Sequence, residues 1–107
     1  MPRLDLDQLT CERKQELVGK DEIRVTVNGV EVFNRKMEKD QSARCDHMEE
    51  FDAGELVAVT VEERDGARYK LIGPVQHISS GEAGSGQQTR DFSTSGTKYV
   101  LSYEVTA

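Results

Sequence analysis

The sequence has no tryptophan and few aromatic residues, with three tyrosines and three phenylalanines among 107 residues. A chain of this length suits one domain with one core of modest size. We therefore expect a single domain over residues 1–107, with its core between about residues 4 and 106.

Cysteine is also scarce, with Cys11 and Cys45 alone in the chain. Two cysteines do not form the disulfide framework typical of small secreted domains. We expect two unpaired, partly buried thiols. A disulfide stays open as the alternative, and it would require the two Cα atoms to lie roughly 5.5 Å apart.

Long apolar runs are missing. No run approaches the ~20 residues that span a bilayer, and the segment Met1–Asp5 lacks the apolar stretch of a signal peptide. We expect no transmembrane segment. The compartment stays open between the cytoplasm, export without a visible signal peptide, and a signal already removed.

Positive charge is in deficit, because 14 Lys and Arg residues face 20 Asp and Glu residues, for a net charge of −6. Affinity for nucleic acid comes largely from basic side chains against phosphates. We therefore expect no nucleic-acid partner, and no binding to a membrane surface unless calcium mediates it. Solubility is the plainer explanation of the acidity.

Helical periodicity is absent, since no window of ten residues or more keeps apolar residues at the i, i+3, i+4 spacing. Short alternating segments separated by turn residues fill the chain instead. This pattern predicts an all-β fold: a single antiparallel β-sandwich of eight, or about seven to eight, strands.

The chain is organised around one segment, Leu56–Gly73. This segment contains the β-branched strand that is densest in apolar residues. The strand ends in two acids, Glu63 and Asp65, just before the turn residue Gly66. The sequence therefore predicts a core strand that delivers two carboxylates to a loop rim.

Two further strand regions have clear alternation. Residues 22–28 alternate and run into Asn28-Gly29, the strongest short hairpin signal, because a type I′ turn needs positive φ at both central residues. Residues 98–105 alternate as well, with Tyr99, Leu101, Tyr103 and Val105 on one face and Val100, Ser102 and Glu104 on the other.

The remaining segments are less regular. We interpret residues 4–13 as an edge strand with a bulge near Gln8, 35–41 as a solvated connection, and 42–48 as a weak strand and second possible edge. Short strands are expected around Ile78 and over 88–92, on either side of a flexible polar loop at 79–86. Phe51 and Phe92 are expected to point into the core.

These features resemble the calcium- and lipid-binding β-sandwich of the C-two (C2) type. In that family a Gly-rich loop ends in an Asp before a strand, and Gly19-Lys20-Asp21-Glu22-Ile23 occupies that place here. The family's later loop begins acid-x-acid and closes apolar-apolar-Gly, which Glu63-Arg64-Asp65 and Leu71-Ile72-Gly73 match. The resemblance covers roughly residues 4–106 and implies a C2-like sandwich with a possible calcium site at Asp21, Glu63 and Asp65.

One departure opposes that calcium site. The family's third acid of the later loop falls on Lys70, which removes a ligand and adds a repelling charge. Lys70 is expected to pair with Asp65 or Asp21 instead. The alternatives are therefore a metal site or a loop rim neutralised within the chain, with no cofactor except possibly calcium.

Catalytic constellations are lacking. Cys45-Asp46-His47 could suggest zinc or a nucleophilic thiol, but no second short-spaced ligand pair is present, and the surrounding acids should raise the pKa of the thiol. We found no nucleophile elbow and no phosphate-binding loop. We therefore expect that the protein is not an enzyme.

The function expected from these residues is a non-enzymatic protein-interaction or accessory binding module. The chain also resembles small bacterial sandwich modules that pair a Val-Asn-Gly hairpin with a tyrosine-rich last strand. Because a complete small sandwich without a catalytic constellation is expected, we interpret the chain as a subunit or accessory domain of a larger bacterial assembly. A protein partner would contact a loop rim, with Glu22, Arg68 and Lys70 as candidate binding residues, or an exposed strand edge. The alternative is a calcium-regulated membrane- or glycan-binding C2-like domain.

Overall fold

The computed structural model describes residues 1–14 and 21–107. In these residues the backbone forms nine strands and one turn of 3-10 helix, η1. Their bounds are β1 (Arg3–Arg13), β2 (Asp21–Val27), β3 (Val30–Met37), β4 (Ser42–Glu50), β5 (Leu56–Asp65), β6 (Arg68–Leu71), β7 (Gln76–Ser79), η1 (Ser80–Glu82), β8 (Gln87–Thr94) and β9 (Thr97–Thr106).

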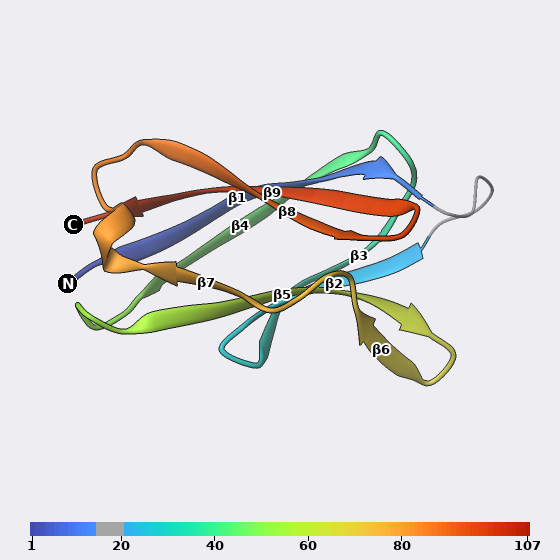
Figure 1. Ribbon diagram of the computed structural model, residues 1–107, viewed down its shortest axis with the longest axis horizontal. Helices are drawn as coiled ribbons and strands as arrows, with labels where there is room; N and C mark the ends of the chain where they lie inside the picture. The colour runs from blue at the N-terminus through green and yellow to red at the C-terminus, as the bar shows by residue number, and fades with distance from the viewer. Residues whose placement is uncertain (15–20) are drawn as a thin grey trace.

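The strands form two antiparallel sheets that pack face to face (Figure 1). One sheet has the order β4-β1-β9-β8; the other has the order β3-β2-β5-β6, with β7 also paired to β5. The predicted antiparallel β-sandwich is confirmed. The described part holds nine strands where eight were expected, a small difference that reflects how short β6 and β7 are, at four residues each.

Strand β5 is a central strand of its sheet, as the sequence predicted. It pairs with β2 along one side and, on the other, with β7 over Leu56–Val59 and with β6 over Glu62–Asp65. The inward residues Val57, Val59 and Val61 are buried. The alternation of β5 thus places Glu63 near its end, next to the β5–β6 turn.

The Asn28-Gly29 hairpin between β2 and β3 is confirmed. Both residues have positive φ, 49° at Asn28 and 81° at Gly29, as a type I′ turn requires. The Asn28 side-chain oxygen also accepts a 2.9 Å hydrogen bond from the Ala58 amide. The turn is therefore tied to β5 as well as closing the hairpin.

The core lies between the two sheets and takes side chains from both. Strand β9 contributes one of its two alternating sets, Tyr99, Leu101, Tyr103 and Val105, each at most 1% exposed. Phe51 and Phe92 are buried too, as expected. On strands with one solvent-exposed face, the alternating apolar residues are therefore the buried ones.

One side of the sandwich is closed by the connection between β6 and β7. Gly73, at φ 73°, approaches β8 so closely that an added Cβ would lie 2.9 Å from both the backbone nitrogen and oxygen of Ser93. The Gln76 side chain donates a hydrogen bond to the Asp91 carbonyl oxygen of β8. The outer edge of β8 is thereby partly covered.

The prediction that residues 4–13 form an edge strand is wrong. Strand β1 lies inside its sheet, between β4 and β9 (Figure 1). Its alternate residues are polar because the outer face of the whole sheet is exposed to solvent, and this pattern does not distinguish an edge from an interior strand. The bulge expected near Gln8 is confirmed by a register shift between Leu6 and Gln8.

Two predicted connections carry regular structure. Residues 35–37 belong to β3, and Met37 is fully buried, because the charged neighbours Arg35 and Lys36 concealed one inward position in the sequence. The expected flexible loop at 79–86 contains η1, which Glu82 anchors.

No helix in the described ranges is long and apolar enough to cross a membrane.

Candidate functional site at a strand edge

The loop-rim acids Glu63 and Asp65 lie together at the end of β5 that leads into β6. Lys70 stands directly opposite Glu63 in the β5–β6 ladder. Its Nζ atom lies 3.6 Å from Oε1 of Glu63 and 3.9 Å from Oδ2 of Asp65. One ammonium group therefore bridges the two carboxylates.

Asp21, the third predicted ligand, has a different lysine partner. Its Oδ2 atom lies 3.8 Å from Nζ of Lys14, whose side chain is 2% exposed. The expected pairing of Lys70 with Asp65 is therefore observed and its pairing with Asp21 is not. Gly19 and Lys20, which precede Asp21 in the motif, lie outside the described residues.

These residues do not fit a calcium site of the kind the resemblance implied. Calcium takes six to eight oxygen ligands at about 2.3–2.6 Å, whereas each of the three carboxylates here faces an ammonium group. In the described part of the chain, no group of three or more His, Cys, Asp or Glu side chains is placed to hold a metal. The lysines perform the neutralisation that a metal would supply.

The candidate binding residue Glu22 belongs to a network on the outer face of the β3-β2-β5-β6 sheet. Its carboxylate accepts hydrogen bonds from the Tyr69 hydroxyl at 2.6 Å and from Arg64 at 3.2 Å, and these bonds lower its pKa. The Arg24 guanidinium lies 3.9 Å above the Tyr69 ring. Glu22 is thus engaged within the chain, while Arg68 is exposed at the start of β6.

The cysteines are free thiols, as expected. Cys45 on β4 packs partly against the core, and burial, with the nearby charges of Asp46 and Asp7, raises its pKa to about 12. Its neighbour His47 instead lies 3.0 Å from Oε1 of Glu49. The thiol is therefore protonated at neutral pH and is not activated as a nucleophile.

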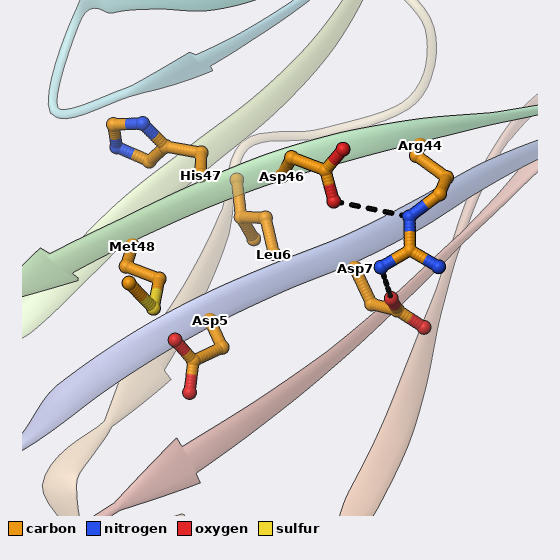
Figure 2. A pocket seen from close by; sticks show the side chains of 7 residues that line it. All are labelled: Asp5, Leu6, Asp7, Arg44, Asp46, His47 and Met48. Atoms are coloured by element: carbon orange, nitrogen blue, oxygen red, sulfur yellow. Dashed lines mark hydrogen bonds and ion pairs between the residues drawn. The ribbon is translucent and has the colours of Figure 1, made fainter.

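A hollow that the sequence did not reveal lies where the β1–β4 ladder is interrupted. The register passes from Leu6–His47 to Gln8–Arg44, so one residue of β1 faces two of β4, and Asp46 takes φ 48°. The cavity volume is about 290 Å³. Its lining residues, drawn in Figure 2, are Asp5, Leu6, Asp7, Arg44, Asp46, His47 and Met48.

Within the hollow, one arginine bridges two acids from different strands. Arg44 donates to Oδ1 of Asp46 at 3.0 Å, and its Nη2 atom lies 3.5 Å from Oδ1 of Asp7 (Figure 2). Beside this bridge, Met48 is 64% exposed. The hollow thus combines acidic groups with one exposed apolar side chain.

Strand β4 is also the edge of its sheet. It pairs with β1 on one side, and no strand in the described residues pairs with its other side. Successive residues of such an edge present backbone N–H and C=O groups that another strand can pair with. The sequence indicated this edge at 42–48 but not the hollow, because the bulge that forms it is a cross-strand feature.

Comparisons with known proteins agree with this fold. No family model matches the chain, and no curated protein matches it. A solved structure described as a C2 domain is similar, with a TM-score of 0.59, 13% sequence identity and full coverage of both chains. Since identity this low indicates the fold alone, the finding is that the chain folds as a C2-like β-sandwich, as the resemblance implied.

Proposed function

We propose that this chain is a non-enzymatic protein-interaction module whose contact surface is the outer edge of β4. The observation that carries the proposal is that no strand among the described residues pairs with the outer side of β4, a strand that also lines the hollow and exposes Met48. C2-like sandwiches are generally binding modules, which agrees with this role. The expected setting, as an accessory part of a larger bacterial assembly, stays a prediction.

The mode of binding would be addition of a partner strand to β4. Main-chain hydrogen bonds supply affinity in this mode, and side chains on alternate sides of the added strand supply specificity. The β8 edge of the same sheet is less suited, because Gly73 from the β6–β7 connection and Gln76 from β7 lie against it. The edge at β3 is also free of strand partners among the described residues, but its residues do not line the hollow.

The alternative, a calcium-regulated membrane- or glycan-binding domain, has less support. It requires Asp21, Glu63 and Asp65 to bind calcium, but the ammonium groups of Lys14 and Lys70 already lie beside these carboxylates. A hydrolase or redox role would rest on Cys45, whose pKa is raised well above neutrality. Neither alternative has a specific observation in its favour.

The proposal can be tested by mapping peptide binding with amide NMR spectra of ¹⁵N-labelled protein. The probes are three nine-residue peptides that alternate Val with Lys, Thr or Glu. At least one should shift the amide signals of residues 42–50 and slow their hydrogen exchange. If all three leave β4 unchanged, or if shifts occur only elsewhere, the edge-binding proposal is wrong.

A further inference from the structure

The charge around the β4 edge is strongly unbalanced. Residues 3–7 of β1 and 44–50 of β4 carry five carboxylates and two guanidinium groups. Arg3 pairs with Asp5, and Arg44 pairs with both Asp7 and Asp46, so negative charge remains in excess. The five acids are Asp5, Asp7, Asp46, Glu49 and Glu50. A strand added at this edge would therefore enter a region of net negative charge.

This imbalance disfavours a second copy of the chain as the occupant. Two β4 strands paired edge to edge would bring the same acids together, and like charges placed opposite each other destabilise strand pairs. The bulge at Asp46, with its φ of 48°, also twists the edge and hinders flat self-association. The favoured partner is a different chain that carries positive charge.

The alternation of side chains along β4 determines where the positive charge of the partner strand would lie. Its even-numbered residues, among them Asp46 and Met48, are exposed on the outer face, whereas Ala43, Cys45 and His47 are buried or partly buried. Side chains of an added strand alternate in the same way. One set would continue the outer, acidic face, and the other would lie along the border of the core.

We propose that the β4 edge binds an extended segment of a partner protein in which basic and apolar residues alternate. Its Lys or Arg side chains lie on the outer face beside Asp46 of β4, and its apolar side chains lie along the inner side of the edge. The inference rests on the proposed function and adds the chemical class of the partner.

Arg44 indicates how a basic side chain is accommodated. Its guanidinium already lies between Asp7 and Asp46, at 3.5 and 3.0 Å, although the side chain is 68% exposed. The hollow thus already holds, from within the chain, the type of group expected from the partner.

The test uses the same peptides in fluorescence anisotropy, each labelled at its N-terminus, with intact wild-type protein. The Val-Lys peptide should bind at least tenfold more tightly than the Val-Glu peptide at low salt. Its affinity should fall when sodium chloride rises from 50 to 500 mM, since exposed charges are screened over about 10 Å at 0.1 M salt. The Val-Thr peptide should show little dependence on salt.

Two variants locate the charge effect. Asp7→Asn combined with Asp46→Asn should weaken Val-Lys binding several-fold, at roughly two- to fivefold for each exposed charge. The matched control is Asp91→Asn on the opposite edge strand β8, which changes charge on the same sheet and should leave the affinity nearly unchanged. Both side chains in the double variant are exposed by more than a third, at 36% and 66%, so the fold should persist.

The outcomes separate the two proposals. If all three peptides shift β4 with equal affinity, the inference about basic partners is overturned and the edge-binding function stands. If the Val-Lys peptide binds but shifts only residues outside β4, the inference about basic partners is overturned. The edge-binding function is overturned as well if the other two peptides also leave β4 unchanged. Tight Val-Lys binding that Asp91→Asn weakens as much as the double variant would also contradict a site at the hollow.

Discussion

Lys70 lies directly across the β5–β6 ladder from Glu63, with its Nζ atom 3.6 Å from Oε1 of that residue. The same ammonium group lies 3.9 Å from Asp65. A lysine therefore stands where the C2 resemblance implied a third acid ligand. Lys70 thus lies beside two of the three candidate calcium ligands, and Lys14 lies 3.8 Å from the third, Asp21.

We predict that calcium does not stabilise the wild-type protein. A ligand that binds only the folded state adds about 2.7 kcal/mol at 100 times its Kd, which moves the thermal midpoint by several degrees in a domain of this size. Thermal unfolding in calcium and in chelator, at matched ionic strength, should give midpoints within about 1 °C of each other. A calcium-dependent rise of several degrees would restore Asp21, Glu63 and Asp65 as ligands.

The role of the lysine can be tested by replacing it. Lys70→Asp should lower the midpoint in chelator, because three carboxylates then lie close together, and calcium should recover part of the loss. Lys36→Asp on β3 makes the same change of charge away from this rim and should not respond to calcium. If both variants behave alike, Lys70 has no special role.

Met37 is a core residue at the end of β3, although charged residues flank it in the sequence. It is fully buried, so Met37→Ala should lower the free energy of unfolding by about 2–5 kcal/mol. Met48→Ala, at a side chain that is 64% exposed, should change it by less than about 0.5 kcal/mol. Urea denaturation measures both, and equal effects would mean that β3 does not extend to Met37.

Gly73 is predicted to be required for the close approach of the β6–β7 connection to β8. Gly73→Ala introduces a Cβ 2.9 Å from two backbone atoms of Ser93 at a positive φ. Gly66 is the matched control, because it has a similar φ of 66° but no atom within 4 Å of an added Cβ. Gly66→Ala should cost about 1–2 kcal/mol, and Gly73→Ala should cost a further 1–3 kcal/mol, roughly, from overpacking.

Glu82 is predicted to make stability depend on acid pH. Burial alone would raise its pKa, but hydrogen bonds from Tyr103 and the Ser79 amide, together with the Arg90 charge, lower it overall. A lowered folded-state pKa gives stability that is present above the ordinary value of about 4.3 and is lost as the pH falls through the folded value. Wild-type protein should therefore lose stability below about pH 4.3.

The variant Glu82→Gln isolates this contribution. It should be less stable than the wild type at pH 7 by about 1–3 kcal/mol, the usual cost of disrupting a partly buried charged hydrogen bond. The difference should shrink as the pH falls below 4, roughly, because the wild-type carboxyl is then protonated. Glu55→Gln, at an exposed position, is the control, and a difference that stays constant with pH would contradict this role of Glu82.

Local patterns predicted much of the fold. The alternation of β9 identified its buried residues, and Asn28-Gly29 identified a turn, because burial and φ preference act within a few residues. The position of β1 inside its sheet could not be predicted in this way. Edge or interior placement depends on which strands pair, and this depends on the whole chain.

The candidate site shows the same division. The sequence identified Glu63, Asp65 and Lys70 as neighbours, since a single hairpin brings them together. It did not reveal the hollow between β1 and β4, whose residues lie about forty positions apart and meet only through a bulge. Neither Asp7 nor Met48 carries a local signal of that meeting.

The most direct test of the account is an amide NMR map of the Val-Lys peptide titration, recorded once in chelator and once in calcium. The account predicts shifts centred on residues 42–50, with the same Kd in both conditions, because the β4 edge and the lysine-neutralised rim are separate surfaces. Shifts that require calcium, or that centre on Asp21, Glu63 and Asp65, would contradict it and would favour a calcium-regulated domain.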